Sequence, residues 1–108
     1  MQTNFGLRNS DIEAICKLLQ KFPQIEQAVI FGSRAKGNFR QGSDVDIALK
    51  GEHLTLQIIA KVSFLLNEET TMPYKFDVLD YHSLKDPTLI ESIDKTGIVL
   101  YENLSEKL

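Results

Sequence analysis

The sequence predicts an α/β (α+β) domain, in which a small mixed β-sheet of about four strands packs against helices. Short apolar or alternating segments that are typical of strands recur along the chain, and segments with helical spacing separate most of them. The link between the first two strands is too short for the crossover that parallel neighbours need, so the sheet is not wholly parallel. At 108 residues, the chain 1–108 is expected to form a single domain.

The first element is predicted to be a helix. Ser10 and Glu13 have the spacing of a capping box, which marks a helix start. Apolar residues then recur at helical spacing as far as about Phe22. The one cysteine, Cys16, lies on this apolar face, so we interpret it as a small buried hydrophobe and not as a nucleophile.

Two strands are predicted next. The continuous apolar run 28–31 is typical of a buried strand, and it stops at Gly32. In the second strand, 44–49, the residues alternate, so one face is apolar while Asp44 and Asp46 share the other. The link between the two strands is expected to be a loop that includes at most one helical turn.

The second half of the chain alternates helices with strands. Thr55 is the expected N-cap of a long amphipathic helix, and the run 75–80 is expected to be the third strand. Asp86 is the expected N-cap of another helix, which stops at Gly97. The last strand is predicted at 98–101, and a polar tail follows it.

Composition narrows the class of protein. The apolar share is 43% and the charged share is 25%, which is ordinary for a globular protein. Acids outnumber bases by 15 to 12, and this argues against direct nucleic-acid binding, for which a basic surface is usual. No segment is long and apolar enough for a membrane span or a signal peptide, so a cytoplasmic location is expected.

The loop after the first strand has features of a phosphate-binding site. Gly32 allows close approach to the backbone, and Ser33 adds a hydroxyl donor. If a helical turn begins here, its free N–H groups face any bound anion. Arg34, Lys36 and Arg40 add three cationic side chains to a net-acidic protein. The alternative is an ordinary turn with solvated basic residues.

The aspartates suggest a metal site. Asp44 and Asp46 lie about 6.6 Å apart on one strand face, where two like charges repel unless a cation offsets them. Asp77 is a third acid within an apolar strand, and it can join them if the two strands are neighbours. Three carboxylates could hold two Mg²⁺ ions. Asp80 lies on the opposite face of its strand, and the alternative for the Asp44 strand is a solvated polar face.

Together these motifs resemble the signature of the DNA polymerase β-like nucleotidyltransferase superfamily. The signature comprises Gly32-Ser33, the run Asp44-Val45-Asp46-Ile47 after ten intervening residues, and a later acid at Asp77. The short chain and the pattern GSRAKG…SDVDI are most similar to the minimal nucleotidyltransferase (MNT) group of bacteria and archaea. Lys36 replaces the arginine that is commoner in that group, which keeps the charge but loses a bidentate fork.

The resemblance implies a nucleotidyltransferase fold and a set of site residues. The residues that would bind the nucleotide triphosphate, expected to be ATP, are Gly32, Ser33, Arg34 and Lys36. The residues that would act in catalysis and bind two Mg²⁺ ions are Asp44, Asp46 and Asp77. The implied reaction is attack of an acceptor hydroxyl on the α-phosphate, with transfer of a nucleotidyl group and release of pyrophosphate.

The resemblance also implies a partner. Larger superfamily members carry further domains for the acceptor, and this chain ends soon after its fourth strand, so a separate chain is expected to supply that part. In the minimal group the partner is often a small all-helical HEPN-type protein, and some pairs are toxin–antitoxin systems in which the toxin is adenylylated. The alternative function is a non-catalytic module that neutralises its partner by complex formation. Acceptor, base preference and homo-oligomeric state stay open.

Overall fold

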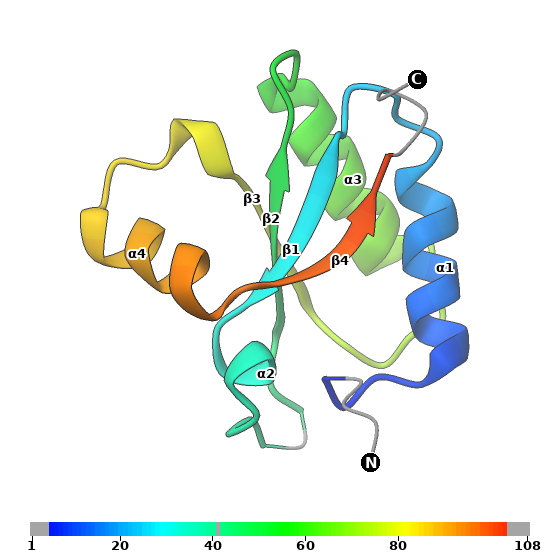
Figure 1. Cartoon of the computed structure of the whole chain (residues 1–108). Coiled ribbons are helices and arrows are strands. Elements are labelled where there is room, and N and C mark those ends of the chain that lie inside the picture. Colours follow the sequence, from blue (N-terminus) through cyan, green and yellow to red (C-terminus); the bar gives the residue numbers. More distant parts are fainter. Residues whose placement is uncertain (1–4, 41, 104–108) are drawn as a thin grey trace.

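A computed structural model describes residues 5–40 and 42–103 of the chain. Helices and strands alternate along it (Figure 1). In chain order the elements are α1 (Asn9–Leu19), β1 (Gln27–Phe31), α2 (Ser33–Lys36), β2 (Val45–Lys50), α3 (Leu56–Glu68), β3 (Phe76–Asp80), the 3₁₀ turn η1 (Tyr81–Ser83), α4 (Pro87–Thr96) and β4 (Ile98–Glu102).

The strands form one mixed sheet in the order β3-β2-β1-β4, which confirms the predicted architecture. β1 pairs antiparallel with β2 and with β4, whereas β2 and β3 run parallel. The parallel pair is joined through α3, because parallel neighbours cannot be joined by a tight turn. Each strand begins and ends within one residue of its predicted bounds.

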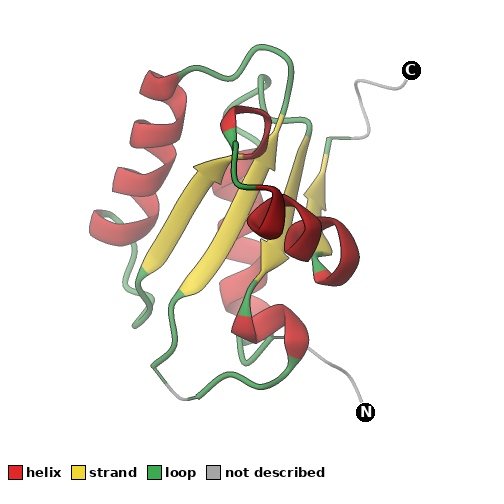
Figure 2. Cartoon of the chain, turned by 90° about the vertical axis from the view of Figure 1, so that its left-hand side faces the viewer, coloured by secondary structure: helices red, strands yellow, loops and turns green. Residues whose placement is uncertain are grey.

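Two hydrophobic clusters cover the two faces of the sheet. The larger lies between the sheet and helices α1 and α3, and its buried members include Ile15, Leu19, Ile30, Ile47, Val62 and Leu66. The smaller comprises Val29, Phe31, Ala48 and Ile93, and it lies under α4, the side that faces the viewer in Figure 2. Side chains alternate along a strand, so Asp46 and Asp77 lie on the α4 face. Cys16 packs against the larger cluster, as predicted for a hydrophobe, although it is half-buried and not fully buried.

The start of α1 differs from the prediction. The N-cap is Arg8 and not Ser10. The Asp11 carboxylate accepts a hydrogen bond from the Arg8 backbone N–H (3.0 Å) and others from its guanidinium, so it takes the capping role predicted for Glu13. The helix also ends before the predicted Phe22, because the N–H groups of Lys21 and Phe22 bond three residues back, to Leu18 and Leu19, in a tighter turn.

The other two predicted N-caps are confirmed. The Thr55 side chain accepts a hydrogen bond from the Ile58 N–H (3.2 Å) at the start of α3, and Asp86 accepts one from the Thr88 N–H (3.0 Å) at the start of α4. Each bond satisfies a donor that has no partner within its helix. Gly97 ends α4 as predicted, although with an extended backbone (φ −66°).

None of the helices within the described residues combines the length and the apolar character that crossing a membrane would require.

Candidate functional site

The predicted acidic residues meet at one end of the sheet, where β1 ends and where β2 and β3 both begin (Figure 1). Phe31 in β1 lies opposite Asp46 in β2, and Asp46 lies opposite Asp77 in β3. Adjacent strands are about 4.8 Å apart, so the two carboxylates adjoin on one face. Asp44 stands just before β2 and is exposed like Asp77, whereas Asp46 is half-buried. The structure therefore places the three predicted acids at the same end of the sheet, with Asp46 and Asp77 on adjacent strands.

Gly32 holds the loop backbone close to these acids. Its φ of 78° lies in the left-handed region that favours glycine. A Cβ built at this position would lie 2.5 Å from Asp46 Oδ2. The lack of a side chain at Gly32 therefore lets the loop backbone approach the carboxylate closely, and a ligand that bridges loop and acids needs this proximity.

Ser33 opens α2, so the loop does contain one helical turn. The first N–H groups of a helical turn have no partner within it and are suited to an anion. Lys36 ends the turn and is exposed, and Gly37 closes it in the left-handed conformation. Gly32, Ser33 and Lys36 thus belong to one short segment beside the carboxylates.

Arg34 lies in the predicted loop, but its side chain is buried, whereas it was predicted to contact phosphate. It is only 2% exposed, and its guanidinium donates hydrogen bonds to the carbonyl oxygens of Phe5 (2.7 Å), Ser43 (2.8 Å) and Asp44 (3.3 Å). With the side chain buried and these donors engaged, the structure argues against a phosphate contact by Arg34. We therefore leave it out of the proposed nucleotide-binding residues.

Asp46 has a strongly perturbed carboxyl group. Burial, and then the charges of Asp77 and Asp44, raise its pKa from the ordinary 3.8 to about 6, while the charge of Arg34 opposes this rise. The carboxylates of Asp44 and Asp77 therefore disfavour the charged form of Asp46 when no cation is bound, in addition to the larger effect of its burial. Such perturbation by burial and neighbouring charge is typical of functional sites.

The donor set of the site suits Mg²⁺, which prefers carboxylate oxygens together with the phosphate oxygens of a substrate. Within residues 5–40 and 42–103, no three acidic, histidine or cysteine side chains are gathered closely enough to enclose one metal ion. Asp44 and Asp77 are exposed, however, so their side chains can turn toward a cation without any change in the core. The residues present therefore fit a divalent metal.

Asn67 is a positioning residue that sequence reasoning missed. Its side chain donates to the Phe76 carbonyl (3.0 Å) and accepts from the Phe76 N–H (2.8 Å). These bonds anchor the start of β3 to α3, immediately before Asp77. An asparagine inside a helix carries no sequence signal for such a contact, because the contact depends on how α3 packs against β3.

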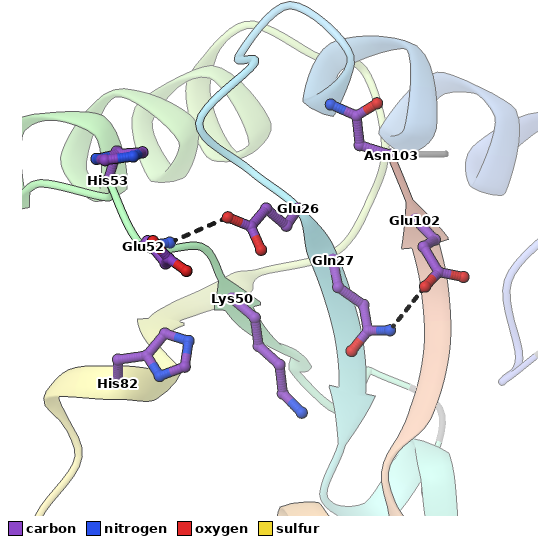
Figure 3. Close-up of a pocket in the computed structure, with 8 residues that line it drawn as sticks. All are labelled: Glu26, Gln27, Lys50, Glu52, His53, His82, Glu102 and Asn103. Atoms are coloured by element: carbon purple, nitrogen blue, oxygen red, sulfur yellow. Dashed lines mark hydrogen bonds between the residues drawn. The ribbon is translucent and has the colours of Figure 1, made fainter. Parts of the chain in front are cut away.

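A separate hollow of about 590 Å³ lies at the opposite end of the sheet (Figure 3). Its lining includes Lys50, His53, His82 and Glu102, and it contains none of the predicted site residues. The Lys50 ammonium lies over the Tyr81 ring, 4.4 Å from its centroid. This hollow is therefore distinct from the acidic end of the sheet.

A glycine-serine turn beside carboxylates from two neighbouring strands is the arrangement expected of an enzyme that transfers phosphoryl or nucleotidyl groups. Comparison with known families agrees, since the family described as Polymerase beta, Nucleotidyltransferase matches residues 13–106. The chain belongs to this polymerase β-like nucleotidyltransferase family. No curated protein sequence matches the chain.

Solved structures share the fold. A chain in a toxin–antitoxin complex with AMP-PNP has a TM-score of 0.70 and 23% identity, over 88% of this chain and 76% of that one. A chain in the complex of a tri-AMPylated Shewanella oneidensis HEPN toxin with its MNT antitoxin has a TM-score of 0.67 and 19% identity, over 94% and 77%. A protein described as a minimal nucleotidyltransferase has a TM-score of 0.65 and 27% identity, over 82% and 88%.

The raised pKa of Asp46 predicts a pH-dependent contribution to stability. Between the unfolded value of 3.8 and the folded value of about 6, the folded state holds the proton more tightly. This group therefore raises the free energy of unfolding as the pH falls through that range, and the contribution is lost as the pH rises. The full shift would be at most about 3 kcal/mol, which solvent screening at a half-exposed side chain reduces to about 1 kcal/mol.

Asp46→Asn tests this dependence by urea unfolding without divalent ions. We expect the variant to exceed the wild type in free energy of unfolding by about 1 kcal/mol at pH 7 and to match it near pH 4. The comparison removes the contributions of all other titrating groups that the two proteins share. A difference that is the same at both pH values would contradict the assignment.

Gly32→Ala and Gly37→Ala separate backbone strain from contact with Asp46. Both glycines have a positive φ, 78° and 82°, so each alanine is expected to cost about 1–2 kcal/mol of stability. A Cβ at Gly37 meets nothing within 4 Å, whereas one at Gly32 meets Asp46 Oδ2. Gly32→Ala should therefore cost at least about 1 kcal/mol more in urea unfolding. Equal losses would show that the carboxylate does not lie against Gly32.

Proposed function

We propose that this protein is a Mg²⁺-dependent nucleotidyltransferase that transfers a nucleotidyl group, AMP from ATP, to a hydroxyl of a partner protein and releases pyrophosphate. The observation that carries the proposal is the placement of Asp46 directly opposite Asp77 and against Gly32. This placement sets a loop suited to phosphate beside carboxylates suited to metal. Family membership supports the same reaction class.

The reaction is an in-line displacement at the α-phosphorus. A bond forms between the acceptor oxygen and the α-phosphorus, and the bond to the oxygen bridging the α- and β-phosphates breaks, so that pyrophosphate leaves. Gly32, Ser33 and Lys36 bind the triphosphate through backbone N–H groups, a hydroxyl and an ammonium group. These contacts hold the α-phosphorus facing the acids.

The three aspartates have complementary roles in the proposal. Asp44 and Asp46 would hold divalent cations, and Asp77 would complete the set and take the proton of the acceptor hydroxyl. Asp77 is suited to this because it is exposed on β3, at the edge of the sheet, where a protein substrate can approach. Bound Mg²⁺ would neutralise the phosphate charge and make pyrophosphate a better leaving group.

We also propose a small helical HEPN-type protein as the partner, in a toxin–antitoxin pair. The support is the fold shared with chains in complexes of this kind, one of which contains an AMPylated HEPN toxin bound to its MNT antitoxin. The fold of this chain adds one supporting feature. The acids lie at an open end of the sheet, so a side chain carried by another protein can reach them.

A second candidate function is neutralisation of the partner by binding alone. The observation that favours it is the spread of the acidic side chains, since none of the described residues form a ready three-ligand metal cluster. In that case the carboxylates would be dispensable, whereas nucleotidyl transfer requires them. The two functions therefore predict opposite results for the same substitutions.

The test uses a HEPN-type protein that binds this chain, Mg²⁺ and ATP labelled on either the α- or the γ-phosphate. We expect label from α-labelled ATP to enter the partner, and label from γ-labelled ATP to leave with pyrophosphate. Asp44→Asn with Asp46→Asn should reduce transfer at least 100-fold, a magnitude typical of losing charge stabilisation at the reacting centre. Gel autoradiography of initial rates gives the comparison.

Asp80→Asn is the matched control, because Asp80 is an acid of the same strand as Asp77 that caps η1 through the His82 N–H. An asparagine can keep this bond, so transfer should stay within about twofold of wild type. Transfer that survives in the double variant would refute the metal assignment. A wild-type protein that neutralises its partner without any labelling, and a double variant that neutralises equally well, would establish the binding function instead.

A further inference from the structure

Arg34 is a buried cation with no ion-pair partner among the residues that the structure describes. It is 2% exposed, and the ion pairs found in the described part of the chain join other residues. A buried guanidinium is costly unless its donors are satisfied. The burial of a charged side chain inside a small domain therefore needs compensation, which its hydrogen bonds supply.

Those hydrogen bonds converge on the chain just before β2. Nε donates to the carbonyl oxygens of Ser43 (3.1 Å) and Asp44 (3.3 Å), and Nη2 donates to that of Ser43 (2.8 Å). Nη1 donates to the carbonyl of Phe5, 2.7 Å away, at the other end of the fork. A single side chain thus ties α2, the loop before β2 and the N-terminal segment together.

Aromatic rings complete the enclosure of the guanidinium. Its central carbon lies 5.0 Å from the centroid of the Phe39 ring and 5.2 Å from that of the Tyr74 ring, in the range of cation–π contacts. Tyr74 is itself fixed, because its hydroxyl donates to the buried Asp11 carboxylate (2.8 Å). The position of Arg34 is therefore determined on several sides.

We propose that Arg34 is a positioning residue for the metal site: it fixes the entry of the chain into β2, so that Asp44 and Asp46 face the same point. This inference rests on the proposed function, since it concerns the carboxylates assigned there to metal binding. Lysine cannot substitute, because one ammonium group cannot span the carbonyls of Phe5, Ser43 and Asp44 in the way that a planar fork does.

The test compares Arg34→Lys with Arg40→Lys, which keeps the same charge in the same loop at an exposed position. Binding of Mn²⁺ alone is measured at 10 °C by the electron paramagnetic resonance of free Mn²⁺. We expect Arg34→Lys to weaken binding at least tenfold and Arg40→Lys to stay within twofold of wild type. Ile15→Val is a control for a general loss of stability, because Ile15 lies in the core on the α1/α3 face and the carboxylates lie on the α4 face. It should lower the melting temperature without changing Mn²⁺ affinity.

Arg34→Lys that binds Mn²⁺ within twofold of wild type overturns the proposal. If this variant does not fold, Phe39→Leu replaces it, because it keeps the arginine but removes one aromatic face, and about threefold weaker binding is expected. Unchanged binding in Phe39→Leu then overturns the proposal in the same way.

Amide hydrogen exchange separates this inference from the proposed function. The Val45 N–H bonds to the Lys75 carbonyl (2.8 Å) at the start of β2. Arg34→Lys should speed exchange at Val45 while leaving Leu49, at the far end of β2, unchanged. Unaltered exchange at Val45 overturns the positioning role. If the wild-type protein binds no Mn²⁺ through Asp46, the metal site is refuted. If exchange at Val45 is nevertheless faster in Arg34→Lys, the role of Arg34 in holding β2 is retained.

Discussion

Parallel pairing of β2 with β3 sets Asp46 directly opposite Asp77, so two like charges share one face of the sheet beside Asp44. Hydrophobic packing must hold this arrangement against their repulsion. The buried alternate residues of both strands provide that packing on the α1/α3 face, and Asn67 anchors the start of β3 from α3. The raised pKa of Asp46 reflects the remaining cost, which a bound cation would relieve.

The two ends of the sheet differ in chemistry. At one end a glycine-rich turn and carboxylates are exposed together, while the other end carries a hollow lined by lysine, histidine and glutamate side chains. Depth alone would favour the hollow as a ligand site. The acidic end has the stronger physical case, because a helical turn with free N–H groups meets a perturbed carboxyl and a positive-φ glycine there, and the last two are each a cost to the fold unless they serve a function.

The helices and strands could be predicted from sequence because they depend on local periodicity, whereas the approach of Asp77 to Asp46 depends on the pairing of β2 with β3. Alternation along β2 places Asp46 on the face opposite Val45 and Ile47, whereas Asp44, which was predicted to be the first residue of this strand, lies just before it. The features that could not be predicted depend on tertiary contacts. A basic side chain in a loop looks the same in sequence whether it is solvated or buried, so the enclosure of Arg34 was not visible. The N-cap of α1 is Arg8 and not Ser10, because the Asp11 carboxylate accepts the Arg8 backbone N–H and is held in place by the Tyr74 hydroxyl.

The central claim is that loop and carboxylates form one site for a metal-bound nucleotide. Paramagnetic broadening of the amide NMR signals by Mn²⁺ with a non-hydrolysable ATP analogue tests it most directly, because broadening falls off steeply with distance from the metal. The account predicts that signals of Gly32, Ser33, Asp46 and Asp77 disappear first, at the lowest Mn²⁺ concentration. The claim would be contradicted if the signals of Lys50 and His82, at the other end of the sheet, disappeared first.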